Sequence, residues 1–170
     1  MSLSPASTGI GQPVQRREDL RLLTGRGRYS DDINVPGQAY AVMVRSAHAH
    51  ARIRAIDTSR ATAVPGVLAV LTGREMLADG LRPIPHAVRT GHPADIQLAN
   101  ADGTDMFIPP HHPMVIDEVR HVGDIVAMVV AGDRSTAMDA AEQVAAEYSE
   151  LAAVVHSRQA FAPGAPLTWS

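Results

Sequence analysis

Residues 118–155 read EVRHVGDIVAMVVAGDRSTAMDAAEQVAAEYSELAAVV, and this stretch decides the fold. Within it, Ile125–Ala131 is apolar without alternation, which is typical of a strand covered on both faces. Gly132-Asp133 then breaks the apolar run. Either Asp133 or Ser135 is able to cap a following helix by accepting a hydrogen bond from an unpaired backbone N–H. The order of these signals predicts one strand–turn–helix–strand unit.

The predicted helix of this unit carries one apolar stripe. Its members recur at helical spacing, and they are Ala137, Ala140, Ala141, Val144 and Tyr148. A second β-rich run, Ala152–Val155, follows at once and predicts the closing strand. Because the stripe would be buried, Val144→Asp is expected to abolish soluble folding. The unit contains no obvious catalytic residues, so it indicates how the chain packs rather than which reaction it performs.

The rest of the chain predicts further short elements. A length of 170 residues suggests a single domain with a real core. Gly25 is well placed to end a short first helix, Pro65-Gly66 to stop a helical turn, and Thr72 to cap another helix. Ile53 and Ile56 do not fall on one strict face of a regular strand, which predicts a small twist or bulge there. The predicted helical segments are Arg16–Leu23, Thr58–Val64 and Arg74–Ala78, and the predicted strands are Gln38–Ser46, Ala51–Asp57 and Val67–Leu71.

The domain is predicted to carry one long excursion. Prolines and glycines interrupt residues 79–113, and hydrophobic periodicity is lost there, which is typical of a loop that is functional, lies on a partner or is disordered. We expect residues 1–13 to form a flexible arm, 14–162 the domain, and 163–170 an exit linker toward further domains. The ending on Trp169-Ser170 favours a domain from a longer polypeptide. The fold class is therefore α/β (α+β), with a mixed sheet, packed helices and the long Pro/Gly-rich loop.

Composition excludes several classes of function. The 15 basic residues are all arginine, so lysine Schiff-base chemistry and lysine-dependent phosphate loops are excluded. There are 0 cysteines, which excludes thiol nucleophiles, disulfides and thiolate ligation of iron–sulfur clusters. The formal net charge of −3 gives no electrostatic case for nucleic acid as a partner. No apolar run approaches a membrane span, and a cytoplasmic location is the default expectation.

The histidines have two readings. His48 and His50 would share a face if they lay on a strand, and His111 and His112 are adjacent, so a metal site is conceivable. No cysteine, H-E-x-x-H motif or carboxylate cluster completes such a site. The alternative, which we favour, is that these residues and the loop histidines His86 and His92 are turn and loop residues. We therefore expect no metal site.

A cluster of arginines lies near the N-terminus: Arg16, Arg17, Arg21, Arg26 and Arg28. The guanidinium group suits carboxylates and phosphates, and Gly25-Arg26-Gly27-Arg28 would let the backbone approach an anion. Arg26 and Arg28 are thus weak candidates for contact with an anion or cofactor. A solvated or partner-facing basic patch is the alternative. No GxGxxG motif after a strand and no P-loop supports a nucleotide site.

No residue is a convincing catalytic candidate. Asp31-Asp32 and Asp57 are acid/base candidates in principle, but carboxylates in such positions are more often turn and cap formers. Ser46 and His48 are too close in sequence to form a triad, and no G-x-S-x-G elbow is present.

An ordered set of short motifs resembles one known domain, the a/b hammerhead of the aldehyde oxidase/xanthine dehydrogenase family, in the form of the carbon monoxide dehydrogenase large chain. The resemblance spans roughly residues 11–166. Ala47, Ser149 and Ala152 depart from the usual pattern, which puts local turn geometry in question. The motifs that carry it are Gly11-Gln-Pro, Arg17-Glu-Asp19, Leu23-Thr-Gly-Arg-Gly-Arg-Tyr29, Asp31-Asp32, Val44-Arg-Ser46, His48-Ala-His-Ala-Arg-Ile53, Ile56-Asp57, Pro65-Gly-Val67, Val70-Leu-Thr72, Val119-Arg-His-Val-Gly-Asp124, Val126–Ala131, Ala140-Ala-Glu142 and Glu147-Tyr148.

The resemblance implies a part of a molybdenum hydroxylase large subunit. Such subunits bind molybdopterin, often as its cytosine dinucleotide, and hydroxylate aldehydes or heterocycles with water or oxidise CO. In that family the pterin-binding segments and the catalytic glutamate lie downstream of the hammerhead. We therefore expect no cofactor in this chain itself. Its implied partners are the downstream molybdopterin-binding domains and the 2Fe-2S and FAD domains or subunits, to which the excursion could contribute contacts.

Two function hypotheses remain. The first is a structural and subunit-contact domain of an oxidoreductase, inactive by itself, which predicts exposed apolar patches where the other domains would dock. The second is an autonomous module that binds a small ligand or a protein, which predicts a closed surface and a real pocket. An independent metal-dependent enzyme is a third, and it would need His48, His50, His111 and His112 to converge.

Overall fold

A computed structural model describes residues 16–85, 99–100 and 102–169. The chain divides into two compact units, Met1–Gln38 and Ala39–Ser170. Residues 1–13, His86, His92 and most of the tip of the excursion lie outside the described residues, so the predictions made for them concern parts that the structure does not describe. No helix among the described residues is long and apolar enough to cross a membrane.

The first unit holds two short helical elements, α1 (Asp19–Leu23) and the 3₁₀ helix η1 (Ser30–Asp32). Gly25 follows α1 with φ +70°, a conformation that a glycine adopts without steric cost, so the predicted stop is confirmed. Asp32 Oδ2 accepts a hydrogen bond from Tyr29 N at 2.9 Å. The carboxylate of Asp32 therefore acts as a cap, as its position in the sequence favoured.

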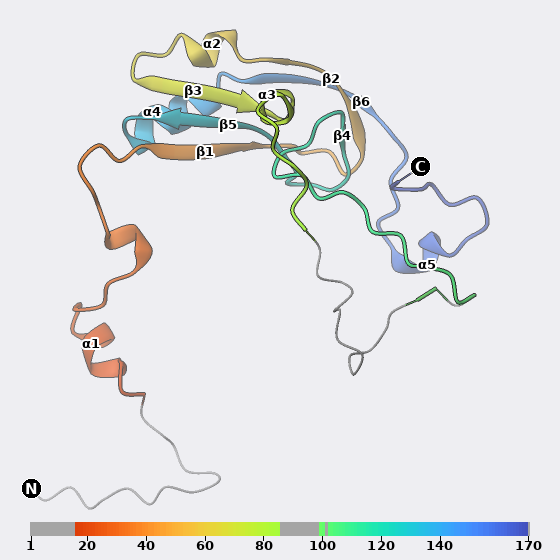
Figure 1. The fold of residues 1–170 in the computed structure, drawn as a ribbon, viewed down its shortest axis with the longest axis horizontal. Helices are drawn as coiled ribbons and strands as arrows, with labels where there is room; N and C mark the ends of the chain where they lie inside the picture. Colours follow the sequence, from red (N-terminus) through yellow and green to blue (C-terminus); the bar gives the residue numbers. More distant parts are fainter. Residues whose placement is uncertain (1–15, 86–98, 101, 170) are drawn as a thin grey trace, which may run out of the picture. The chain divides into compact units, whose positions relative to one another are not determined.

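The second unit is built on two three-stranded sheets, and all of their strand pairs are antiparallel. The first sheet has the order β1-β5-β3, formed by β1 (Tyr40–Arg45), β5 (Ile125–Ala131) and β3 (Val67–Thr72), which Figure 1 shows side by side. β5 is the central strand, so both of its edges are paired, and none of its side chains is exposed, which agrees with the strand covered on both faces that its apolar run predicted. Val129 of β5 lies opposite Val42 on one side and Val70 on the other.

The second sheet has the order β4-β2-β6, formed by β4 (Glu118–Val119), β2 (Ala51–Asp57) and β6 (Ala145–Glu150). The register of β2 against β6 shifts between Ile53 and Ala55, so the predicted bulge is confirmed. The α/β class is confirmed as well. The strands nevertheless form two antiparallel sheets where the sequence predicted one mixed sheet, because β6 pairs with β2 rather than extending the sheet of β5.

Helix α4 (Arg134–Ala141) follows β5 and contacts all three strands of the first sheet. Asp133 caps it by accepting a hydrogen bond from Thr136 N at 2.9 Å, while the hydroxyl of Ser135 donates to Asp133. Of the two candidate caps, Asp133 is therefore the one that accepts from the backbone. Ala137 and Ala140 are fully buried, and their small side chains allow the helix to lie close to the sheet.

The predicted helix was too long, and the closing strand comes earlier than predicted. The helix ends at Ala141, and β6 already begins at Ala145, so Val144 and Tyr148 are not part of a helical stripe. Ala152–Val155 forms no strand. Tyr148 instead lies opposite Ile53 of β2 in a cross-strand pair. The pairing with β2 outweighs the helical preference of the alanines, which is a long-range effect. The reason given for Val144→Asp is therefore wrong, since Val144 is only half-buried and lies after the helix.

A small apolar core joins the two sheets. Its fully buried members are Ala51, Val119 and Val126, and they are surrounded by half-buried side chains: Val44, Ile53, Ile56, Val115 and Tyr148. Among the described residues, the largest fully buried side chains are valines. This core is modest, and many larger apolar side chains of the chain lie outside it.

Three further helices are short: α2 (Ser59–Thr62), α3 (Gly73–Ala78) and α5 (Ser157–Ala160). Thr72 caps α3 as predicted, because its hydroxyl accepts from Arg74 N at 3.3 Å. Glu75 completes a capping box by accepting from Thr72 N at 2.9 Å. The hydrogen bond from the Thr72 hydroxyl to Glu75 lowers the pKa of that carboxyl.

The two arms of the excursion meet shortly after α3. Ile84 pairs with His111 in an isolated antiparallel bridge, and Ile84 N donates to His111 O at 2.7 Å. A second bridge links Ala99 and Asp105. The excursion thus leaves and rejoins the domain at neighbouring points, and its second arm leads directly into Val115 and β4.

Candidate functional site

The turn between β1 and β2 places His50 in a half-buried, charged environment. Its side chain is 10% exposed, and its Nε2 lies 2.9 Å from Glu118 Oε1. Its Nδ1 lies 2.8 Å from the carbonyl oxygen of Ala152. These contacts raise the pKa of His50, first through the hydrogen bond with the Ala152 carbonyl and then through that with the Glu118 carboxylate. His50 is thus a structural residue that joins β4 to the segment after β6.

Glu118 and Arg120 extend this contact into a network. Arg120 NH2 lies 3.4 Å from Glu118 Oε1, and the same carboxylate has Arg52 NH2 at 4.0 Å from its other oxygen. Arg120 Nε donates to the carbonyl oxygen of Thr168 at 3.0 Å, and the guanidinium group lies 3.6 Å from the centroid of the Trp169 ring. A cation stacked on an indole in this way is held by both charge and packing.

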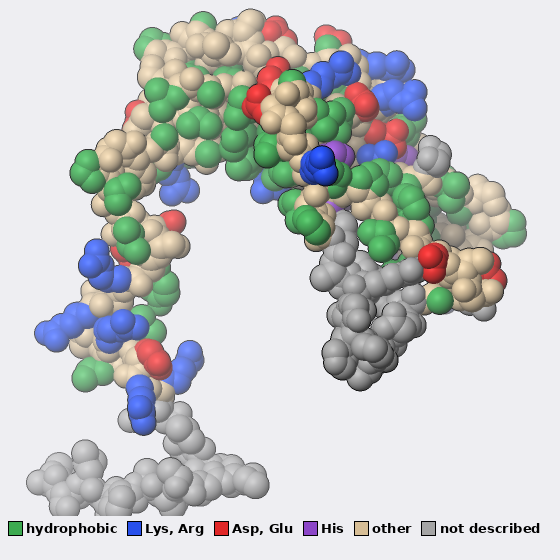
Figure 2. All heavy atoms as spheres, in the orientation of Figure 1, with side chains coloured by type: hydrophobic (Ala, Val, Ile, Leu, Met, Phe, Trp, Pro, Cys, Tyr) green, Lys and Arg blue, Asp and Glu red, His purple; other side chains and the backbone are tan. Residues whose placement is uncertain are grey.

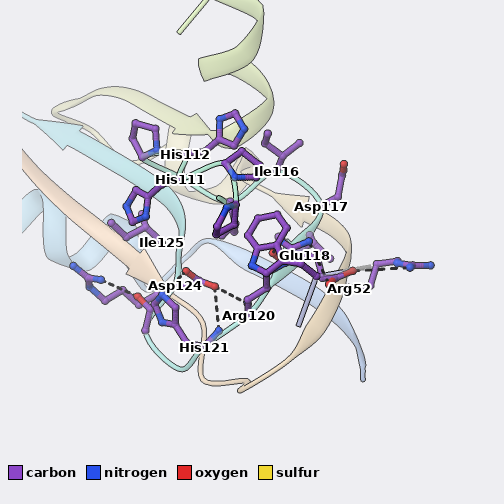
Figure 3. A pocket seen from close by; sticks show the side chains of 18 of the residues that line it. Arg52, His111, His112, Ile116, Asp117, Glu118, Arg120, His121, Asp124 and Ile125 are labelled. Carbon is purple, nitrogen blue, oxygen red and sulfur yellow. Dashed lines mark hydrogen bonds and ion pairs between the residues drawn. The ribbon is translucent and has the colours of Figure 1, made fainter. Parts of the chain in front are cut away.

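Asp124 fixes the turn that follows Arg120. One carboxylate oxygen accepts from Arg120 N at 2.6 Å and from His121 N at 3.2 Å. The other lies 2.8 Å from His121 Nε2. Arg45 closes the same turn by donating to Gly123 O at 2.8 Å. Figure 3 shows Asp124, Arg120 and Glu118 together, with these interactions dashed.

The network forms part of the wall of a hollow of about 980 Å³. The other walls come from the end of β1, from β2, from α3 and from the second arm of the excursion (Figure 3). Acidic and basic groups in the wall are paired with one another, as Arg74 is with Asp117 at 3.1 Å. His112 Nδ1 is buried without a hydrogen-bond partner. His50 and Arg120 line a second, smaller hollow of about 210 Å³.

The histidines that the structure describes do not converge on a metal site. His111 and His112 line the larger hollow, whereas His50 lines the smaller one. His48 packs against the ring of Tyr148 and lies 3.3 Å from Glu150. In the part of the chain that the structure describes, no three His, Asp or Glu side chains are grouped to hold a metal ion. The described residues therefore give no support to the reading of an independent metal-dependent enzyme.

The arginine candidates lie in the first unit. Arg26 and Arg28 are exposed and line neither of the two hollows. Arg16 makes a loose ion pair with Asp19 at 3.8 Å. No described contact of Arg26 or Arg28 assigns either residue a role in cofactor chemistry. Contact between these two arginines and an anion stays a prediction.

The remaining acid/base candidates have structural roles. Asp57 accepts a hydrogen bond from Ser59 N at 2.9 Å and so caps the turn into α2, and its hydrogen bonds with Ser59 lower its pKa. Ser46 is buried, and its Oγ accepts from His48 N at 3.0 Å. Both groups stabilise turns.

Sequence reasoning missed the network of His50, Glu118, Arg120 and Trp169. Its long-range contacts join distant positions: His50 and Glu118 are 68 residues apart, and Arg120 lies 48 residues from Thr168, next to Trp169. No local period or spacing connects them. The only signal was the run Val119–Asp124, which carried the family resemblance without suggesting contacts.

Comparison with known proteins decides the family. The model of the "Aldehyde oxidase and xanthine dehydrogenase, a/b hammerhead domain" matches residues 24–91 and 86–152, which together make up well over half of the chain. The chain belongs to this family. The resemblance that the short motifs indicated is thereby confirmed, together with the fold class that it implied.

Individual relatives support the assignment. The carbon monoxide dehydrogenase large chain of Afipia carboxidovorans is 39% identical over 159 residues, which is 94% of this chain and 17% of the relative. The putative xanthine dehydrogenase molybdenum-binding subunit of Escherichia coli is 36% identical over 88% of this chain and 18% of its own length. The solved structure of reconstituted CO dehydrogenase from Oligotropha carboxidovorans has a TM-score of 0.72 at 37% identity, covering 94% of this chain and 17% of that one. This hammerhead therefore spans less than a fifth of the curated relatives that it matches.

Proposed function

We propose that this hammerhead is a structural and subunit-contact domain of the large subunit of a molybdenum hydroxylase. The parent enzyme would hydroxylate an aldehyde or heterocycle with oxygen from water, or oxidise CO. Its molybdopterin, in the cytosine dinucleotide form, would be held by downstream domains, and its 2Fe-2S and FAD groups by partner domains or subunits. The hammerhead alone would be inactive.

The observation that carries this proposal is a set of exposed apolar side chains on α3 and on the two arms of the excursion, which we call the excursion surface. It consists of Leu77, Leu81, Ile84, Phe107 and Ile108, whose exposed fractions range from 39% to 65%. The arms that carry these side chains meet at the Ile84–His111 bridge. Figure 2 shows hydrophobic side chains exposed around α3 and the segments near it. Monomeric proteins rarely leave so many large apolar groups together in water.

The arms of the excursion surface favour a folded partner over an added strand. Pro83 and Pro85 flank Ile84, and Pro109 and Pro110 follow Ile108. Since proline has no backbone N–H, these arms offer few donors to a pairing strand. Contact through apolar side chains, as between two folded domains, is the arrangement that remains. About four-fifths of the relatives' length lies outside the matched part. We expect the domains in that remaining part to cover the excursion surface.

Domain limits follow from the same proposal. Residues 14–162 would form the domain, residues 163–170 would lead to further domains, and residues 1–13 would be an arm. The alternative function, an autonomous binding module, is supported by the hollow of about 980 Å³. Most of its charged wall groups are already paired with one another, however, and this leaves few groups for a small ligand.

A chimera tests the proposal. Residues 14–162 would replace the matching part of the Afipia carboxidovorans large chain, and the molybdenum content of the purified enzyme would be measured. We expect a loaded, soluble chimera, and loss of molybdenum and of soluble assembly when Leu81, Ile84 and Phe107 are all changed to Asp. Leu68→Asp is the matched control, because Leu68 is 65% exposed but lies on β3, away from the excursion surface.

Equal loading of the triple variant and the unmodified chimera would contradict the proposal. The folding of the triple variant is checked separately by circular dichroism of the 170-residue chain. This separates loss of docking from loss of the fold.

A further inference from the structure

The segment after β6 is fastened to the domain at both of its ends. We call residues 152–169 the C-terminal segment; apart from the short helix α5, it forms no regular element. At its start, Leu151 N donates to His50 O at 2.9 Å and the Ala152 carbonyl faces His50 Nδ1 at 2.8 Å. At its end, the Thr168 carbonyl accepts from Arg120, and the Trp169 ring stacks under the same guanidinium group.

The carboxylate of Glu118 connects the contacts at the two ends of the segment. Glu118 Oε1 lies 2.9 Å from His50 Nε2 and 3.4 Å from Arg120 NH2. Its side chain is 19% exposed, so the charge on Glu118 is largely withdrawn from water and depends on these cations. Weakening the contact at His50 therefore affects the contact at Arg120 through Glu118.

The geometry around His50 requires a proton on each ring nitrogen. A neutral imidazole carries one N–H and one lone pair, so it can donate to only one acceptor. Both nitrogens of His50 face oxygen atoms, the Ala152 carbonyl and the Glu118 carboxylate, at hydrogen-bond distance. Only the imidazolium form satisfies both contacts. After loss of one proton, one of the two oxygens faces a lone pair.

We propose that His50, Glu118 and Arg120 form a latch that holds the C-terminal segment on the domain, and that deprotonation of His50 opens it. The latch depends only on contacts within this chain, and it is independent of the reaction that a parent subunit would catalyse. It would make the path of the chain leaving the domain sensitive to pH.

The charged groups around His50 set the direction of the pH effect. Glu118 of β4 favours the proton, Arg120 opposes it, and Arg52 of β2 competes for the same carboxylate. The neighbouring His48 lies against Glu150 of β6, and His121 against Asp124.

Because the folded-state pKa of His50 is raised, the stabilisation is complete below the ordinary value near 6.5 and is lost as the pH rises through the raised value. The closed-to-open ratio therefore falls as the pH rises from the ordinary value to the raised value, and it levels off above the raised value.

Two readouts follow the two ends of the latch in the 170-residue chain. Trp169 is the only tryptophan in the sequence, so its fluorescence reports the outer end. Hydrogen exchange in peptides covering residues 151–169, expressed as protection relative to intrinsic rates, reports the inner end. Between pH 5.5 and 8.5 we expect protection to fall measurably and Trp169 emission to shift to longer wavelength. Peptides from β5 should remain protected.

Variants assign the effect to His50. His50→Gln should abolish the pH dependence and show low protection at both pH values, and Glu118→Gln should loosen both ends. His156→Gln is the matched control, since His156 is an exposed histidine on the same segment, and its pH dependence should match that of the unmodified chain. If His50→Gln does not fold, the comparison of the unmodified chain with His156→Gln still tests the pH response.

Two results would overturn the latch. One is unchanged protection and emission of the unmodified chain across this pH range while the core stays folded. The other is a folded His50→Gln variant that keeps the full pH dependence, which would assign the transition to another histidine.

Discussion

At Gly73 the first residue of α3 passes so close to the second arm of the excursion that a side chain does not fit. A Cβ built there would lie 2.8 Å from the carbonyl carbon of Val115 and 3.2 Å from Ile116 Cα. Both are backbone atoms, so relief requires movement of the chain rather than of a side chain. The close approach positions the arm that leads into β4, and therefore Glu118.

Gly73→Ala should accordingly destabilise the domain by about 2 kcal/mol or more, because overpacking against backbone forces a shift of the chain. The control is Gly132→Ala, where a Cβ meets nothing within 4 Å. That change should alter stability by no more than about 0.5 kcal/mol. Urea unfolding followed by circular dichroism measures both. Equal stability of the two variants would mean that α3 and the arm are not in contact.

At the scale of elements, the cap of α4 carries a pH-dependent contribution. Asp133 accepts hydrogen bonds from the Ser135 hydroxyl, from Thr136 N and from the Thr136 hydroxyl, at distances from 2.6 to 2.9 Å. These bonds lower the pKa of Asp133 to about 2. A lowered pKa stabilises the fold above the unfolded value near 3.8, and this stabilisation is lost as the pH falls through about 2.

Asp133→Ala should therefore lower the melting temperature at neutral pH, because α4 loses its cap. Asp133→Asn should retain much of the cap, since the amide oxygen also accepts from the backbone, and it should lose less stability than the unmodified chain on going from pH 4 to pH 2. Thermal unfolding at pH 7, 4 and 2 makes the comparison. The same acid sensitivity in the Asn variant would show that other carboxyl groups dominate.

Local chemistry predicted the elements well, and long-range pairing accounts for the errors. The strand at Ile125–Ala131, the bulge after Ile53, and the caps at Thr72 and Asp133 follow from residue type and short spacing. The boundary after α4 was wrong, because alanines such as Ala145 and Ala146 suit a helix until β2 offers them a pairing edge. The contacts of His50 with Glu118 and Ala152 were unpredictable for the same reason, since no local pattern brings such distant positions together.

At the scale of the whole molecule, the chain combines a small core with a large amount of exposed apolar surface. The buried set among the described residues consists mainly of alanines and valines, while leucine, isoleucine and phenylalanine side chains of the excursion surface face solvent. A domain that folds around a modest core and offers its larger side chains outward is suited to packing against further domains. The match to less than a fifth of the curated relatives agrees with that role.

We propose that the chemistry of the parent enzyme lies outside this hammerhead. The most direct test is the molybdenum and pterin content of the purified 170-residue chain, measured together with hydroxylase activity toward aldehydes, purines and CO. We expect neither bound molybdopterin nor turnover. Stoichiometric molybdopterin on the isolated chain would contradict it, and would point to Arg26 and Arg28 as residues that hold a cofactor.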